Sequence, residues 1–173
     1  MKIAACELPR SSILDRSYVE NAYFRDSYEA TLTKWPITMT SIFFAVFGHN
    51  PQWVKNILIA RNRIAYWCGL EVPSADEINN IIIKDHYSVG DKIGPWPIYY
   101  LSESELVAGR DNSHLDFRLS LLRVIRDGAP HVIVSTICTV HNTYGKIYLF
   151  FIVPFHKWGV QRLIANAIET GRL

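Results

Sequence analysis

The sequence is poor in cysteine and lacks the short motifs by which common enzyme classes are recognised. Cys6, Cys68 and Cys138 lie far apart, and no two of them form a C-x-x-C. An odd number of cysteines at such spacings argues against a disulfide framework and a zinc knuckle, and favours a reducing cytoplasm. G-x-S-x-G, G-x-G-x-x-G, P-loop and H-E-x-x-H motifs are all missing. We therefore expect no metal ion, no cofactor and no nucleophilic triad.

The chain also lacks a strong charge bias and a long apolar run. Eighteen basic and sixteen acidic residues leave a formal charge of +2, which predicts no nucleic-acid partner. The longest strictly apolar run extends from Ile147 to Phe155, which is shorter than the about 20 residues of a transmembrane helix. A length of 173 residues with 49% hydrophobic residues fits one globular domain. We expect an irregular arm over residues 1–17 and a single domain over residues 18–173.

The order of apolar patterns predicts an α+β fold. Alternation at period two, bounded by turn residues, predicts strands over residues 18–32, 97–101, 105–109, 114–125 and 131–141. Asp127-Gly128 predicts a hairpin between the last two strands. Helical spacing predicts two short helices after the first strand, over residues 38–47 and 50–68, and Ile81–Ile83 is a candidate short strand.

The sequence of the tail, residues 142–170, predicts one long helix, and Pro154 should kink it. A final strand from Ile147 to Val153, followed by a shorter helix, is the alternative. The first half of the tail is apolar on every side, which predicts that the fold covers it on every side.

Polar candidates for chemistry are few. His114, Asp116 and Arg118 form a candidate polar row on one face of a predicted strand, where a carboxylate would orient an imidazole. The opposite face of that strand is the apolar one, so a solvent-facing row is the simpler interpretation. Glu103 and Glu105 fall at a predicted turn, and we interpret both as solvated surface residues.

Several short segments of the sequence are similar to segments of a known family. They are FGHNPQWV (residues 47–54), RNR (61–63), GL (69–70), HLDFR (114–118) and VPFH (153–156). With them the chain resembles an uncharacterised bacterial family, a domain of unknown function in the superfamily of START, pollen-allergen and polyketide-cyclase-like proteins (SRPBCC). The resemblance implies a helix-grip fold, in which a curved antiparallel sheet wraps around a long C-terminal helix and leaves a hydrophobic cavity. It assigns no catalytic residues.

We expect this cavity to bind a small apolar or aromatic ligand without catalysis. An interaction or oligomerisation module is one alternative, because the apolar tail with Lys146, Lys157 and Arg162 would suit a protein partner, a homodimer or a membrane face. A cyclase- or hydratase-like enzyme is the other, and a titratable pair pointing inward would favour it. The predicted cavity residues are Leu115, Phe117, Leu119, Val134, Thr136 and Cys138 on the sheet, and Tyr148, Phe151 and Phe155 on the helix.

Overall fold

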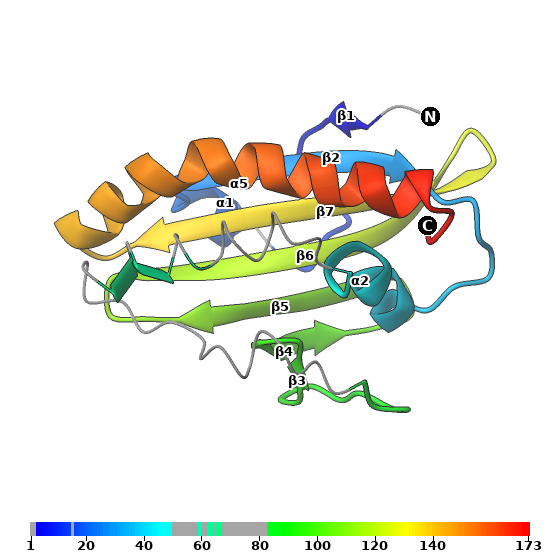
Figure 1. Cartoon of the computed structure of the whole chain (residues 1–173), viewed down its shortest axis with the longest axis horizontal. Helices are drawn as coiled ribbons and strands as arrows, with labels where there is room; N and C mark the ends of the chain where they lie inside the picture. Colours follow the sequence, from blue (N-terminus) through cyan, green and yellow to red (C-terminus); the bar gives the residue numbers. More distant parts are fainter. Residues whose placement is uncertain (1–2, 15, 50–58, 60–61, 64, 67–82) are drawn as a thin grey trace.

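A curved antiparallel sheet forms the body of the protein (Figure 1). This computed structural model describes residues 3–14, 16–49, 59, 62–63, 65–66 and 83–173. Within them the sheet has seven strands in the order β1-β2-β7-β6-β5-β4-β3. The strands are β1 (Ala4–Ala5), β2 (Phe24–Thr31), β3 (Lys92–Ile93), β4 (Trp96–Leu101), β5 (Glu105–Asp111), β6 (Leu115–Arg126) and β7 (Ala129–Val140).

The hairpin of β6 and β7 is the centre of the sheet. Its strands pair without interruption from Leu115 and Val140 to Arg126 and Ala129. Asp127 and Gly128 connect them with φ angles of 51° and 77°, which suit a two-residue turn that matches the twist of the strands. The predicted hairpin is confirmed.

Three described helices pack on the sheet: α1 (Arg16–Glu20), α2 (Met39–Phe47) and α5 (Thr143–Glu169). The Asn142 side chain accepts a hydrogen bond from the Gly145 amide and so caps α5 at its start. The helix then continues through Pro154 to Glu169. The prediction of one long tail helix is confirmed, and the alternative of a strand over residues 147–153 is wrong.

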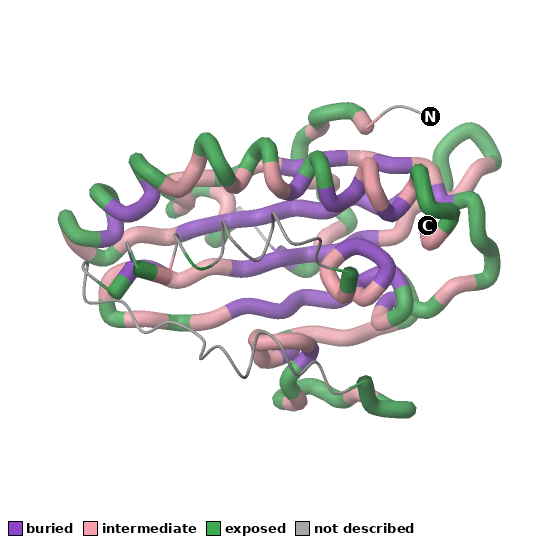
Figure 2. The backbone as a smooth tube through the Cα atoms, in the orientation of Figure 1, coloured by how far each residue is buried: buried purple, intermediate pink, exposed green. Residues whose placement is uncertain are grey.

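The helices lie on both faces of the sheet. α5 runs along β2 and β7, and α2 lies over β5 and β6 on the same face, which we call the inner face (Figure 1). α1 contacts β7 from the opposite, outer face. The buried stretches of β5, β6 and β7 run beneath α2 and α5 (Figure 2). This is the helix-grip arrangement that the sequence predicted.

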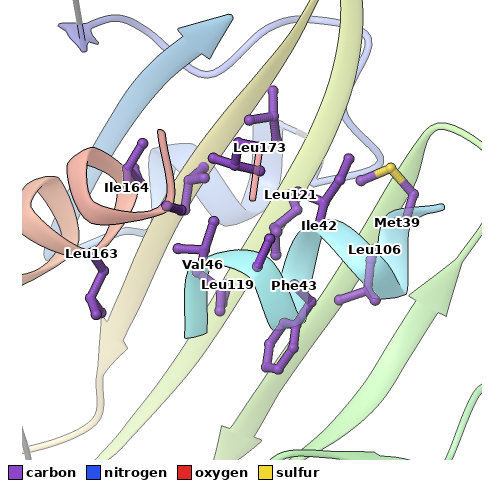
Figure 3. Close-up of a cluster of buried hydrophobic side chains, with 14 of the residues drawn as sticks. Met39, Ile42, Phe43, Val46, Leu106, Leu119, Leu121, Leu163, Ile164 and Leu173 are labelled. Atoms are coloured by element: carbon purple, nitrogen blue, oxygen red, sulfur yellow. The ribbon is translucent and has the colours of Figure 1, made fainter. Parts of the chain in front are cut away.

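The main hydrophobic core lies where α2, the C-terminal half of α5 and the inner face meet (Figure 3). Alternate strand residues point inward, and α2 adds one apolar side. The side chains at this junction include Met39, Ile42, Phe43, Val46, Leu106, Leu119, Leu121, Leu163, Ile164 and Leu173.

Two predictions about local structure need correction. Residues 16–20 are helical and the first long strand begins only at Phe24, because the aromatic residues of 18–23 belong to α1 and the turn after it. The outer side of α5 is also not covered, since Phe150 is 76% exposed.

The predicted helix over 50–68 and the candidate strand at Ile81–Ile83 fall mostly outside the described residues. No helix in the described part of the chain is long and apolar enough to cross a bilayer.

Candidate functional site

The inner face carries one acidic side chain among apolar neighbours. Phe24, Tyr28 and Ala30 of β2 pack into the hydrophobic clusters of the inner face, and Asp26 shares their parity, so it points to the same side. Its neighbour across the β2–β7 pairing is Thr136. Directly opposite residues of an antiparallel pair bring their side chains together. β2 and β7 therefore place a carboxylate and a hydroxyl side by side beneath α5.

α5 adds an imidazole to this cluster. His156 Nε2 lies 3.5 Å from Asp26 Oδ1, and the His156 ring packs edge-on against Phe24 with 5.6 Å between ring centroids. We call Asp26, Thr136 and His156 the inner polar cluster. It joins residues that are far apart in sequence through strand pairing and helix packing.

The polar atoms of this cluster are buried and have few hydrogen-bond partners. Thr136 Oγ1 and His156 Nε2 form no hydrogen bond within the described structure, and the Asp26 carboxylate meets the Tyr28 hydroxyl and His156 Nε2. The Asp26 side chain is only 8% exposed. Burial, and then the negative charge of Asp26, raise the pKa of the Tyr28 hydroxyl, which also forms hydrogen bonds with Gln161 and Asp26. Native proteins pair nearly all buried polar groups, so a place where three such residues meet calls for an explanation.

Hydrophobic clusters flank the inner polar cluster on both sides. Toward the start of α5 lie Leu115, Cys138, Tyr148 and Leu149, and toward its end lie Val134, Leu163 and Ile164 among others. A few polar groups within a mainly apolar wall are typical of small-molecule sites.

The predicted cavity residues fall largely around this cluster. Leu115, Leu119, Val134, Thr136, Cys138 and Tyr148 are buried on the inner face or beneath α5, and Phe117 is partly buried against the same clusters. Phe151 and Phe155 are 51% and 56% exposed. These two rings lie on the outer side of α5 and do not belong to the layer between helix and sheet, because helical spacing turns them away from Tyr148.

The outer face holds a second polar cluster around a pocket of about 210 Å³. The Arg118 guanidinium is buried there, with 8% of the residue exposed. It pairs with Asp111 at 2.5 Å and lies over the Tyr99 ring, 3.9 Å from its centroid. The pocket is lined by Tyr18, Asn21, Asp116, Arg118, Ile137 and Thr139.

The groups of the outer cluster satisfy one another. Burial alone would raise the pKa of Asp111, but hydrogen bonds from Arg118 and Tyr99 hold it below its ordinary value. Burial, and then the hydrogen bond to Asp111, raise the pKa of Tyr99. Asp116 lies 2.9 Å from His141 Nε2 and accepts a hydrogen bond from the backbone N–H of Asn112. This paired network contrasts with the inner polar cluster.

Only part of the predicted polar row comes together. Asp116 and Arg118 line the same pocket, but His114 precedes β6 and contacts the start of α5, with its Nδ1 2.8 Å from Asn142 Nδ2 and its ring against Tyr144. The imidazole that pairs with Asp116 is that of His141, at the end of the neighbouring strand.

Glu105 is not the surface residue that the sequence predicted. It is buried on the outer face and accepts hydrogen bonds from Ser12 Oγ at 2.6 Å, the Ile13 amide at 2.8 Å and Ser120 Oγ at 2.6 Å. A buried carboxylate with three donors is well compensated. It fixes the N-terminal segment to the sheet, where Leu14 packs against Ile137 and Val107.

Comparison with known families gives a match over residues 18–163, to the family described as "Protein of unknown function (DUF2867)". The chain belongs to this family. No curated protein matches the chain. The DUF2867 match runs from α1 into α5 and includes the whole inner polar cluster, and it confirms the resemblance to an uncharacterised family.

The sequence did not point to two residues of the inner polar cluster, Asp26 and His156. The available signal was local: Asp26 interrupts the alternation of Phe24, Tyr28 and Ala30, and His156 interrupts an apolar helix. Neither interruption says what lies opposite, because the two residues meet only once α5 has packed along β2. Among the described residues, no group of three His, Cys, Asp or Glu side chains is placed to hold a metal ion.

Proposed function

We propose that this DUF2867 protein binds a small ligand between the inner face and α5, with the ligand's polar group held by the inner polar cluster. The observation that supports this most is the meeting of the Asp26 carboxylate, the Thr136 hydroxyl and the His156 ring in one buried place, where Thr136 Oγ1 has no hydrogen bond in the described structure and His156 Nε2 lies 3.5 Å from Asp26 Oδ1. A buried charge with so few partners is costly to folding. A fold that keeps such a group gains from it in another way, and binding a hydrogen-bond donor is the simplest gain.

The chemistry of the cluster defines the ligand class. An ionised carboxylate only accepts hydrogen bonds, and the Thr136 hydroxyl can donate or accept. The matching head group offers N–H or O–H donors, as an amine, amide or hydroxyl does, and a cationic amine matches the charge of Asp26 best. The flanking clusters of Tyr148, Leu149 and Ile164 suit an apolar or aromatic body. The helix-grip superfamily that the sequence resembles has its cavity in the same layer, which adds support.

The test uses two probes of equal shape and opposite head group, 1-naphthylmethylamine and 1-naphthoate, in isothermal titration calorimetry. We expect the amine to bind and the carboxylate to bind much more weakly. Asp26→Asn should weaken amine binding by about tenfold or more, since a charge-assisted hydrogen bond contributes about 1.5–3 kcal/mol. Asp116→Asn removes a carboxylate from the outer face and is the matched control, with unchanged binding. Equal binding of both probes, or equal effects of both substitutions, would contradict the proposal.

An enzyme of the cyclase or hydratase kind is a second candidate, and the inward pair of Asp26 and His156 favours it. A carboxylate next to an imidazole orients it, as general acid–base catalysis requires. The 3.5 Å separation is longer than a hydrogen bond, and such contacts commonly shorten when substrate binds. A bound ligand that wild type converts and His156→Gln binds without converting would establish catalysis. A ligand recovered unchanged from wild type would exclude it for that ligand.

A further inference from the structure

The outer side of α5 presents large apolar side chains to solvent. Phe150, the most exposed, has 76% of its surface accessible. Their spacing of mostly three or four residues places them on one side of the helix, away from the sheet. Contiguous exposed apolar surface of this kind marks an interaction site. We call this set the outer stripe: Tyr144, Ile147, Phe150, Phe151, Phe155 and Trp158.

The charges that α5 itself carries along the outer stripe all have one sign. Lys146 and Lys157 are exposed along its flank, with their ammonium groups 6.0 Å from the Tyr23 ring centroid and 5.8 Å from that of Phe24. Arg162 continues the same helix and forms an ion pair with Glu169 at 3.6 Å, beyond the stripe. The sequence has no Asp or Glu from Thr143 to Ile168. The stripe is therefore an aromatic surface bordered by cations.

We propose that the outer stripe binds the surface of a membrane containing anionic lipids, with α5 lying along that surface. Rings such as Trp158 and Tyr144 are favoured at the boundary between head groups and acyl chains. Lys146 and Lys157 complement the lipid phosphates. The opposite side of α5 remains packed on the sheet through Tyr148, Leu149 and Ile164, which keeps the helix parallel to the surface it contacts.

The charge pattern favours an anionic surface over a second copy of the chain. A symmetric contact between two stripes would bring the same lysines together, and the helix offers no carboxylate between residues 143 and 168 to pair with them. Like charges facing each other oppose association. The inference does not depend on the proposed ligand.

The experiment measures co-flotation of the purified protein with vesicles of phosphatidylcholine alone and of phosphatidylcholine mixed with phosphatidylglycerol. We expect binding to the mixed vesicles that weakens as salt is raised. Lys146→Gln and Lys157→Gln should each lower the partition coefficient about fivefold, which corresponds to about 1 kcal/mol per basic residue near an anionic surface. Phe150→Ser with Phe151→Ser should lower it by about tenfold or more. Ile125→Ser, at an exposed position on β6 outside the outer stripe, is the matched control.

Several outcomes would overturn the proposal. One is that the protein fails to float with phosphatidylglycerol vesicles. Another is that the Phe150 and Lys146 variants, shown to be folded by circular dichroism, float as wild type does. A third is a wild-type dimer in analytical ultracentrifugation that Phe150→Ser dissociates, which would assign the outer stripe to a second copy. If the double phenylalanine variant does not fold, the lysine variants and the salt dependence decide the question on their own.

Discussion

Thr136→Val tests whether the inner polar cluster is under-satisfied in the free protein. Valine keeps the β-branched shape of threonine and replaces the hydroxyl with a methyl group. The substitution of a buried threonine ordinarily lowers stability because a hydrogen bond is lost. Thr136 Oγ1 is buried with no hydrogen bond within the described structure, so the substitution removes a desolvated group and no bond.

The magnitude follows from the cost of a buried hydroxyl without a partner, which is about 1–3 kcal/mol in proteins. We expect the free energy of unfolding to rise by about 1 kcal/mol, and Tm by about 2–4 °C for a chain of this length. Ser135→Ala is the matched control, one residue away and on the outer face. Ser27 donates a hydrogen bond of 2.8 Å to Ser135, and both residues are buried. This control should lose about 1–2 kcal/mol, since the Ser27 hydroxyl is left unpaired.

Urea unfolding followed by circular dichroism gives both free energies, and the same Thr136→Val sample should bind 1-naphthylmethylamine more weakly than wild type does. Stability and binding then move in opposite directions, as expected where a group is kept for function. If Thr136→Val lowered the free energy of unfolding as much as Ser135→Ala does, Thr136 would have a structural hydrogen bond and the reasoning would fail.

Two more predictions concern the outer face. Glu105→Ala removes the acceptor of three hydrogen bonds and should cost about 3–5 kcal/mol; hydrogen exchange of the amides from Leu8 to Leu14 should become faster. Unchanged exchange there would mean that Glu105 does not hold the N-terminal segment. Asp111 has a pKa below its ordinary value in the folded protein, so its stabilisation is present above the unfolded pKa and is lost as pH falls through the folded pKa. Between about pH 5 and pH 2, wild type should therefore lose more stability than Asp111→Asn, and parallel curves would contradict the role of the Arg118–Asp111 pair.

Much of the fold could be predicted because its signals are local. Period-two alternation from residue 114 to 140, the Asp127-Gly128 turn and the beginning of the tail helix near residue 142 each depend on neighbouring residues alone, and each is found in the structure. The start of the first strand was missed for the same reason. Aromatic residues at 18–23 resemble a strand locally, while packing against Val107 and Ile137 stabilises the residues of α1 and the turn after it on the outer face.

The candidate site was less predictable because it depends on contacts between distant segments. The apolar side of β6 and β7 identified the correct layer, including Thr136, but no local pattern indicates that Asp26 and His156 meet there. The error at Phe151 and Phe155 has another cause. An all-apolar helix was expected to be buried all round, and α5 instead keeps an exposed apolar side.

A crystal structure of the protein with 1-naphthylmethylamine would locate the probe's nitrogen atom relative to Asp26. We predict that this nitrogen lies about 2.7–3.2 Å from an Asp26 oxygen, with the naphthyl ring between α5 and the inner face. A complex in which the probe lies elsewhere, and Asp26 is bonded only to protein donors or to one water molecule, would contradict the account.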